Sequence, residues 1–360
     1  MPAVRIAIDA RAAAEVPAGR GRHVRELLRH LARLDADHTY ELLAREPWTE
    51  GDLDGRFRWT RVAGRDPAWV VPAAAAARRA DVLLATTSYL LAALATVPAV
   101  AIVYDLVAFD PALRAPRGSL FERLTLPLAA RRARAFVCIS EATRQALLAR
   151  YPQVEARAHA VPLAADERFD GRGAEAAARL GLQRPYVLIT GTLEPRKNLP
   201  RVIEAFAGLP GELRDRYELV LAGPRGWDLA DTDATIASHR DLVRTLGYVA
   251  EADLPGLYAG AELFCYPSLG EGFGLPILEA MGAGTAVLTS SVSSMPEVAG
   301  DAARLVDPFD VGAIRAALAE LLADGDLRAD LARRGRERAA RFSWERTARE
   351  TLAIVEAAAT

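Results

Sequence analysis

Two glutamates stand eight residues apart at a glycine-rich turn. Glu271 is inside the turn at residues 270–274, and Glu279 is in the segment that follows. Eight residues of helix span about 12 Å at about 1.5 Å per residue, so the carboxylates cannot hold one small group together. Because an ionised carboxylate only accepts hydrogen bonds, the pair suits the two ends of an elongated ligand with hydroxyl groups, such as a sugar. A surface loop with two solvated acids would show the same spacing.

The turn connects a predicted strand to a predicted helix. The strand covers 263–266, and the helix over 275–281 carries Pro276 in its first turn, where proline is tolerated. Backbone N–H groups of the turn then lie at the positive end of the helix dipole, which favours a phosphate or a hydroxyl group.

The only lysine of the chain, Lys197, is the neighbour of the only asparagine, Asn198. All the other basic residues are arginine, which replaces lysine on most surfaces but not where a compact point charge is needed. Arg196 and Lys197 follow a predicted strand at 186–190, so they are expected at the ligand-binding edge of a parallel sheet. Two cations and a helix N-terminus can hold a diphosphate without a metal. A charged turn without a ligand is the alternative interpretation.

Strands and helices are predicted to alternate along the whole chain, which indicates an α/β protein with parallel sheets. Its 360 residues suffice for two domains, and we expect two Rossmann-like doubly wound domains that face each other across a cleft. The N-terminal domain is expected at 1–165, a polar linker at 166–184 and the C-terminal domain at 185–341. The predicted strands are 4–10, 40–44, 57–62, 82–86, 97–104, 135–139, 186–190, 218–222, 242–248, 263–266, 285–289 and 304–306, and the predicted helices include 23–34, 199–207, 253–259, 275–281, 296–299 and 311–323.

The first strand is followed by Gly19 and Gly21 at the start of a helix, where the backbone can approach a ligand closely. The third glycine of a dinucleotide fingerprint is missing. Further along, the strand at 97–104 ends in Tyr104 and Asp105, so Asp105 is expected at the ligand-binding edge of the first sheet.

Two segments of the first half are rich in arginine. The helix at 23–34 presents a basic face that either meets an anionic surface or is simply solvated, and the second segment mixes arginines with leucines. This mixture suits a helix near an anionic membrane or an anionic acceptor, and equally a helix with ordinary exposed arginines. The arginines are Arg22, Arg25, Arg29 and Arg33 in the first segment, and Arg114, Arg117, Arg123, Arg131, Arg132 and Arg134 in the second.

Composition argues against several classes of protein. The formal net charge of −2 gives no basic field for nucleic acid, and Cys138 and Cys265 lie in apolar runs expected to be core. No signal peptide and no apolar run of about 18 residues is recognised, so a cytoplasmic protein is expected. The histidines lack metal-ligand spacing, and four Asp-x-Asp triplets are interpreted as connectors rather than metal sites: Asp35 to Asp37, Asp52 to Asp54, Asp231 to Asp233 and Asp324 to Asp326.

Four motifs occur in a fixed order: Gly191-Thr192-Leu193-Glu194-Pro195-Arg196-Lys197-Asn198, Leu246-Gly247-Tyr248-Val249, Tyr266-Pro267-Ser268 leading to Glu271 and Glu279, and Phe342-Ser343-Trp344-Glu345. Together they resemble the GT-B glycosyltransferases of family 4, also called group 1, over essentially the full chain. The resemblance implies retaining transfer of a hexose from a nucleotide diphosphate sugar, of the GDP-mannose, UDP-hexose or dTDP-hexose type, to an acceptor hydroxyl. It implies no metal and no cofactor, and a place in polysaccharide, O-antigen or glycolipid assembly.

The resemblance also implies a role for each site residue. Glu271 would hold donor sugar hydroxyls and Glu279 the ribose, while Arg196 and Lys197 would stabilise the leaving diphosphate. The backbone amides of Gly272, Phe273, Gly274 and Leu275 would contact the sugar and the diphosphate, and Tyr248 and Val249 would lie along the nucleobase. Gly19 and Gly21 of the opposite domain would close on the phosphates. Gly191 is a further candidate for substrate binding, and Asp105 is a candidate catalytic residue. The tail at 342–360 resembles a helix that crosses back to the N-terminal domain.

Two positions depart from the family pattern. Many relatives carry histidine where this chain has Tyr104, and arginine where it has Thr192, which leaves Arg196 as the second cation. A nucleotide-sugar epimerase, a glycosyl phosphorylase, a dinucleotide-dependent oxidoreductase and a non-catalytic nucleotide-sugar binding protein are the alternatives. The expected acceptor is a sugar, a lipid-linked group or another hydroxyl compound. The sequence leaves open whether the protein also makes a peripheral contact with the inner face of the membrane.

Overall fold

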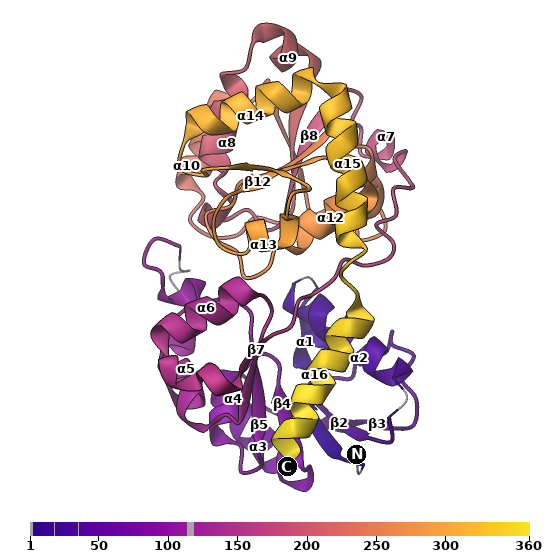
Figure 1. Ribbon diagram of the computed structural model, residues 1–360, viewed down its shortest axis with the longest axis vertical. Helices are drawn as coiled ribbons and strands as arrows, with labels where there is room; N and C mark the ends of the chain where they lie inside the picture. Colours follow the sequence, from indigo (N-terminus) through magenta and orange to yellow (C-terminus); the bar gives the residue numbers. More distant parts are fainter. Residues whose placement is uncertain (1–2, 18, 35, 114–118) are drawn as a thin grey trace. The chain divides into compact units, whose positions relative to one another are not determined.

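The structure, a computed structural model, describes residues 3–17, 19–34, 36–113 and 119–360. The chain forms two compact units (Figure 1). One consists of Met1–Leu163 together with Ser343–Thr360, and the other of Ala164–Phe342. Each unit contains one sheet, and the strand pairs in the described chain are parallel, which confirms the two doubly wound sheets expected from the sequence.

The first unit has a sheet of seven strands in the order β3-β2-β1-β4-β5-β6-β7. Every residue of β4 and β5 is buried, as expected for parallel strands covered on both faces. The elements are β1 (Arg5–Asp9), α1 (Arg11–Glu15), α2 (Arg20–Arg33), β2 (Thr39–Ala44), β3 (Phe57–Arg61), α3 (Val70–Ala76), η1 (Ala77–Arg79), β4 (Val82–Ala85), α4 (Tyr89–Leu94), β5 (Ala99–Val103), η2 (Val107–Phe109), α5 (Ser119–Arg132), β6 (Ala135–Cys138), α6 (Glu141–Arg150), η3 (Pro152–Arg157), β7 (Ala158–Ala160) and α16 (Trp344–Ala359).

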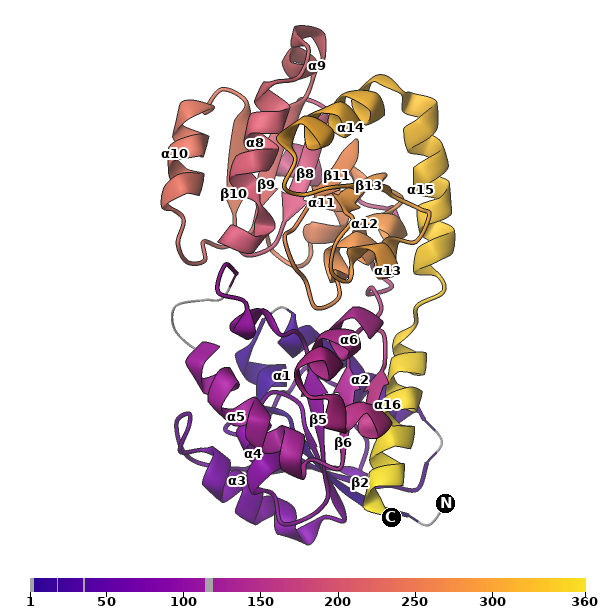
Figure 2. The ribbon, with the colours of Figure 1, turned by 60° about the vertical axis from the view of Figure 1, so that its left-hand side comes forward.

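Two helical layers enclose this sheet. The terminal helix α16 packs on α2 and on β4, β5 and β6, while α3, α4 and α5 pack against one another (Figure 2). Trp344, Ala348, Leu352 and Val355 of α16 are buried, at the spacing of one helix face. The last helix of the chain therefore completes the core of the first unit, as the family resemblance implies.

The second unit has six strands in the order β10-β9-β8-β11-β12-β13. Helices α8, α10 and α14 pack together in one layer, and α11, α12, α13 and α15 in another (Figure 2). The elements are α7 (Ala176–Arg179), β8 (Tyr186–Thr190), η4 (Pro195–Lys197), α8 (Leu199–Ala207), α9 (Gly211–Arg216), β9 (Glu218–Ala222), α10 (Ala230–Ser238), β10 (Val243–Gly247), α11 (Leu254–Ala259), β11 (Leu263–Tyr266), α12 (Leu275–Ala283), β12 (Val287–Ser290), α13 (Met295–Ala299), β13 (Arg304–Val306), α14 (Val311–Ala323) and α15 (Gly325–Ala339).

Some expectations need correction. The segment 166–184, expected as a linker, is part of the second unit, because Phe169, Ala176 and Leu182 are buried there and α7 packs on α11. Asp231 and Asp233 are in the first turn of α10 rather than in a connector, and Asp324 caps α15 by accepting from the Leu327 N–H at 2.8 Å. Asp35, Arg114 and Arg117 lie outside the described residues.

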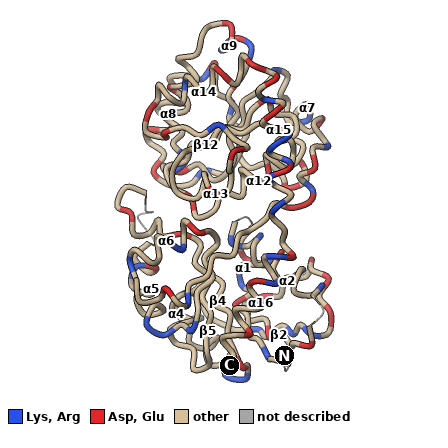
Figure 3. Tube along the Cα trace, in the orientation of Figure 1, with Lys and Arg blue, Asp and Glu red and all other residues tan. Residues whose placement is uncertain are grey.

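The basic face expected on α2 is largely used within the first unit. Arg22 is buried, Arg25 donates to the carbonyls of Ala13 and Val16, and Arg29 pairs with Glu26. Along both units, basic and acidic residues alternate over short distances (Figure 3). Among the residues that the structure describes, no helix has the length and apolar character needed to span a membrane.

Candidate active site in the second unit

The loop after β8 brings the lysine and asparagine into fixed positions. Asn198 adopts a left-handed conformation with φ of 62°, which asparagine tolerates better than most residues. Its side-chain amide donates to the carbonyls of Pro267 and Pro308, at 3.1 and 2.7 Å. Asn198 therefore ties its loop to the loops that follow β11 and β13, and in doing so it fixes the backbone next to Lys197.

The Glu271 carboxylate accepts hydrogen bonds from two cationic side chains and one phenol. Its Oε1 accepts from Lys197 Nζ at 2.7 Å and from the Tyr266 hydroxyl at 2.8 Å, and its Oε2 accepts from Arg196. Arg196 also pairs with Glu194 at 2.6 Å. We call Glu271, Arg196, Lys197 and Tyr266 the Glu271 cluster. The side chains of Glu271 and Lys197 are only 8% and 6% exposed, so their charges interact in a partly desolvated environment.

Burial and pairing act in opposite directions on these groups. Burial alone would raise the pKa of Glu271, but the charges of Arg196 and Lys197 and the hydrogen bonds of the cluster lower it to about 2. Burial lowers the pKa of Lys197 below its ordinary value, against the opposing effect of Glu271. The pKa of Tyr266 is raised well above its ordinary value by burial and by Glu271, so the phenol keeps its proton. Glu271 is thus an ionised hydrogen-bond acceptor at neutral pH.

The glycine-rich turn is held by serines. Gly274 has φ of 108° and precedes α12, so the turn needs glycine there. Ser293 and Ser294 donate to the Glu271 carbonyl at 2.6 and 3.0 Å, and Ser294 also contacts the Phe273 carbonyl at 2.7 Å. These carbonyl contacts direct the backbone of the turn so that α12 begins at Leu275, with its first N–H groups beside the Glu271 cluster.

Glu279, about one turn into α12, is buried and accepts a hydrogen bond from the Tyr258 hydroxyl at 2.9 Å. Tyr258 also contacts the Thr190 hydroxyl, at 2.5 Å. Because the phenol has a single proton and a carboxylate can only accept, Thr190 must be the donor to Tyr258. The end of β8 is therefore connected to Glu279 through one tyrosine.

The other residues predicted for the second unit lie around these acids. Tyr248 follows β10 with 66% of its surface exposed, whereas Val249 is buried, so of these two residues only Tyr248 is accessible from solvent. Gly191 has φ of 113°, and its carbonyl would lie 2.0 Å from a Cβ at Gly223, which shows how closely the two loops approach. Thr192 is exposed beside this loop.

In the first unit, Tyr104 and Asp105 follow β5 as expected. Asp105 Oδ1 accepts from the Val107 N–H at 3.0 Å, which makes it a turn-forming residue in this state. The Tyr104 hydroxyl lies 3.1 Å from Nδ1 of His23, whose ring stacks on Trp344 of α16. Burial lowers the pKa of His23 to about 4, so the imidazole is neutral at pH 7.

The two N-terminal glycines have different roles. Gly19 has φ of 55°, and a Cβ there would meet open space. Gly21 is the second residue of α2, and a Cβ there would lie 1.7 Å from the Val16 carbonyl oxygen. Gly21 is therefore explained by the packing of α2 on the preceding turn, while Gly19 keeps an accessible backbone.

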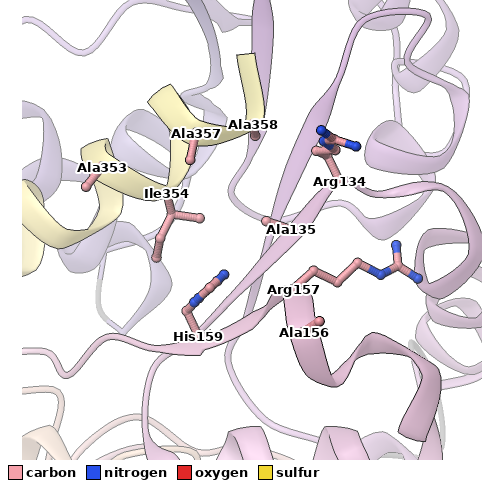
Figure 4. Close-up of a pocket in the computed structure, with 9 residues that line it drawn as sticks. All are labelled: Arg134, Ala135, Ala156, Arg157, His159, Ala353, Ile354, Ala357 and Ala358. Carbon is pink, nitrogen blue, oxygen red and sulfur yellow. The ribbon is translucent and has the colours of Figure 1, made fainter. Parts of the chain in front are cut away.

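The first unit also contains a shallow hollow. It measures about 510 Å³ and lies at the amino ends of β6 and β7 beside the end of α16 (Figure 4). Arg157, on its wall, donates to carbonyls at the end of α5. Ligands of open parallel sheets bind at the opposite strand ends, so this hollow is not assigned to the reaction. Among the described residues there is no group of three His, Cys, Asp or Glu side chains that could hold a metal ion.

Sequence reasoning missed the groups that support the acids. Tyr258, Ser293 and Ser294 come from α11 and the loop after β12, and no motif of the sequence connects them with Glu271 or Glu279. Tyr266 precedes Glu271 in one of the motifs, but the motif does not show that its hydroxyl donates to Glu271. The only local signal is the pair of tyrosines eight residues apart, the same separation as that of the two glutamates.

The chain is similar to known proteins in both halves. The model of the Glycosyltransferase Family 4 matches residues 17–169, and that of the Glycosyl transferases group 1 matches residues 175–338. The O-antigen chain mannosyltransferase B of Escherichia coli is 47% identical over 169 residues, which are 46% of this chain and 44% of that protein. The MMP alpha-(1->4)-mannosyltransferase of Mycolicibacterium hassiacum is 33% identical over 228 residues, 61% of this chain and 53% of that protein.

The matched segments thus span about half the length of these relatives, or less. Among solved structures, HepE of Anabaena in complex with UDP and glucose has the same fold, with a TM-score of 0.78 at 17% identity over 98% of this chain and 99% of that one. The two family models, one on each half, together with the matching fold, show that the chain belongs to the GT-B glycosyltransferases of family 4, or group 1.

Proposed function

We propose that this chain transfers a hexosyl group, with mannosyl the favoured one, from a nucleotide diphosphate sugar to an acceptor hydroxyl with retention of configuration. The observation that carries the proposal is the Glu271 cluster at the N-terminus of α12. Both relatives named above are mannosyltransferases, and HepE was solved with UDP and glucose.

Each group of the site has a task in this reaction. The Oε2 atom of Glu271 accepts from Arg196 and retains a second lone pair, which suits a sugar hydroxyl. Arg196 and Lys197 are available to the leaving diphosphate, whose growing negative charge they stabilise together with the amides of Gly272 to Leu275. Glu279 accepts from the ribose hydroxyls, and Tyr248 stacks on the base.

The ground state of the site is electrically balanced. Glu271 and Glu194 carry two negative charges that offset those of Arg196 and Lys197. As the glycosidic bond breaks, the diphosphate gains charge next to both cations, so their attraction is strongest in the transition state. The same two cations do for the diphosphate what a divalent metal would do, and we therefore propose that transfer is independent of a metal.

Retention is proposed through attack on the same face from which the diphosphate departs. Glu271 is held by three donors and has a pKa of about 2, which makes it a weak nucleophile and a poor general base. The departing phosphate oxygen then accepts the proton of the acceptor hydroxyl.

The first unit is proposed to make a peripheral contact with an anionic membrane. Leu120, Phe121, Leu124 and Leu128 on α5 are 38–62% exposed and lie on one face of the helix. Exposed arginines at 123, 131 and 132 adjoin this face, which suits anionic headgroups around inserted apolar side chains. The chain should sediment with phosphatidylglycerol vesicles and not with phosphatidylcholine vesicles; equal recovery of Leu124→Ser/Leu128→Ser with the anionic vesicles would exclude α5.

The test of the proposed reaction is a transfer assay with GDP-mannose, UDP-glucose and dTDP-glucose, with a hydroxyl acceptor present and EDTA added. The expected result is transfer from one of these donors and a product whose anomeric proton, observed by NMR, has the configuration of the donor. Hydrolysis or epimerisation without transfer would support the alternative enzymes, and binding without turnover would support a binding protein. An inverted product or complete inhibition by EDTA would contradict retention or metal independence.

A further inference from the structure

Each acid of the proposed donor site is held by its own buried tyrosine. Tyr266 donates to Glu271 at 2.8 Å, and Tyr258 donates to Glu279 at 2.9 Å. Both rings are buried, and the pKa of each phenol is raised well above its ordinary value by burial and by the neighbouring carboxylate. Both phenols therefore remain protonated donors throughout the range in which an enzyme of this kind works.

The hydrogen-bond inventory fixes the direction of each contact. A phenol has one proton, so Tyr266 donates to Glu271 and accepts from Lys197, while Tyr258 donates to Glu279 and accepts from Thr190. Tyr266 is therefore shared by a cation and an anion of the Glu271 cluster. Its hydroxyl sets the separation of Lys197 and Glu271, in addition to their direct contact.

The rings of Tyr258 and Tyr266 both pack against the ring of Phe264. Phe264 lies between them in sequence, with ring centroids 5.2 Å from Tyr258 and 5.5 Å from Tyr266. Tyr266 and Phe264 are on β11, and Tyr258 is on the helix before it. Because buried aromatic rings of this size have little freedom to move, the three rings hold the two hydroxyls at a fixed spacing.

We propose that Tyr266 and Tyr258 are a pair of positioning residues for the nucleotide-sugar donor, Tyr266 for its sugar and diphosphate end through Glu271 and Lys197, and Tyr258 for its ribose end through Glu279. The inference rests on the proposed function. It adds that each tyrosine positions one end of the donor through the acid that it holds, without touching the donor itself. This division predicts that loss of the Tyr266 hydroxyl affects the chemical step, whereas loss of the Tyr258 hydroxyl affects donor binding.

The experiment compares three tyrosine-to-phenylalanine variants of the full chain. Tyr266→Phe should lower kcat by about 10- to 100-fold with a small change in KM, because the orientation of Glu271 and Lys197 matters most in the transition state. Tyr258→Phe should raise the donor KM and the Kd of the nucleoside diphosphate by about 10-fold, with kcat little changed. Tyr217→Phe is the control, since it also loses a buried hydroxyl of the second unit, bonded at 3.2 Å to the Leu322 carbonyl.

The outcomes are distinct. If the wild type transfers sugar and Tyr266→Phe and Tyr258→Phe match Tyr217→Phe in both kcat and KM, the pair has no positioning role and only this inference falls. If both variants lose activity in the same way as an unfolded sample, with circular dichroism unlike that of Tyr217→Phe, the role is structural and the inference is again overturned. If the wild type binds none of the nucleoside diphosphates or sugar donors, the proposed function falls and takes the inference with it.

Discussion

Glu271 holds Arg196 and Lys197 in place before any donor binds, and this preorganisation is the central feature of the site at the scale of residues. A buried ion pair of this kind contributes little to stability on balance, because desolvation offsets much of the attraction. In the proposed reaction, its value is that the charge is already arranged where the diphosphate would bind.

The first prediction concerns Glu271 itself. Glu271→Gln keeps the size of the side chain but loses its charge, so Lys197 loses its anionic partner, Arg196 keeps only Glu194, and the sugar hydroxyls lose an anionic acceptor. We expect kcat/KM to fall at least about 100-fold. Glu194→Gln is the matched control, since Glu194 is a second partner of the same arginine. Steady-state kinetics with equal losses in the two variants would contradict a special role for Glu271.

The sequence predicts these residues as candidate site residues, but it does not predict the residues that hold them in place by hydrogen bonds. Glu271, Glu279, Arg196 and Lys197 were predicted from spacing, from the single lysine and from the order of motifs. Tyr258 and the serines of the loop after β12 could not be, because hydrogen bonds between elements depend on how strands and helices pack rather than on any local pattern.

At the scale of elements, the carboxyl ends of the strands determine where the candidate site residues lie. Strands β8, β10 and β11 place Lys197, Tyr248 and Glu271 in the loops at the same edge of the second sheet, as the topology of parallel sheets requires. The predicted strand ends were within about two residues of those observed, because buried parallel strands are short apolar runs bounded by polar turns.

Asn198 gives a prediction for the loop between β8 and α8. Replacing it with alanine removes two hydrogen bonds to loop carbonyls and leaves at φ of 62° a residue that tolerates the left-handed region less well than asparagine. Asn198→Ala should therefore lower the free energy of unfolding by about 2–4 kcal/mol. Asn198→Gly removes the same bonds without the steric conflict and should be about 1 kcal/mol more stable than the alanine variant. Urea denaturation would measure both, and an alanine variant at least as stable as the glycine variant would contradict the backbone argument.

His23 gives a pH dependence to the packing of α2 against α16. Its folded pKa of about 4 is below the ordinary 6.5, so the unfolded chain binds the proton more readily between these values. Stability contributed by the neutral ring is complete above pH 6.5 and is lost as pH falls toward 4. From pH 7 to pH 5 the wild type should lose about 2 kcal/mol more than His23→Gln, which has no titrating group there. Urea titrations at the two pH values would measure the difference, and parallel losses would refute it.

At the scale of the whole molecule, the sequence predicted two doubly wound sheets and a terminal helix that returns to the first unit, and all three are observed. It failed for the helices without a clear apolar period, such as α7, α9 and α10, and for the segment at 166–184. Among these helices, α9 has no buried residue and α10 has only Thr232, so neither carries the apolar stripe by which a local pattern predicts a helix, and α7 is only four residues long.

The account depends most on a nucleotide diphosphate binding to the second unit through the cations and the two acids. Calorimetric titration of the full chain with GDP, UDP, dTDP and ADP in the presence of EDTA tests this directly. The account predicts saturable binding of at least one nucleotide, weakened about 10-fold or more by Glu279→Gln and by Lys197→Met and unchanged by Tyr217→Phe. Absence of binding by all four nucleotides, or equal affinity in the wild type, Glu279→Gln and Lys197→Met, would contradict it.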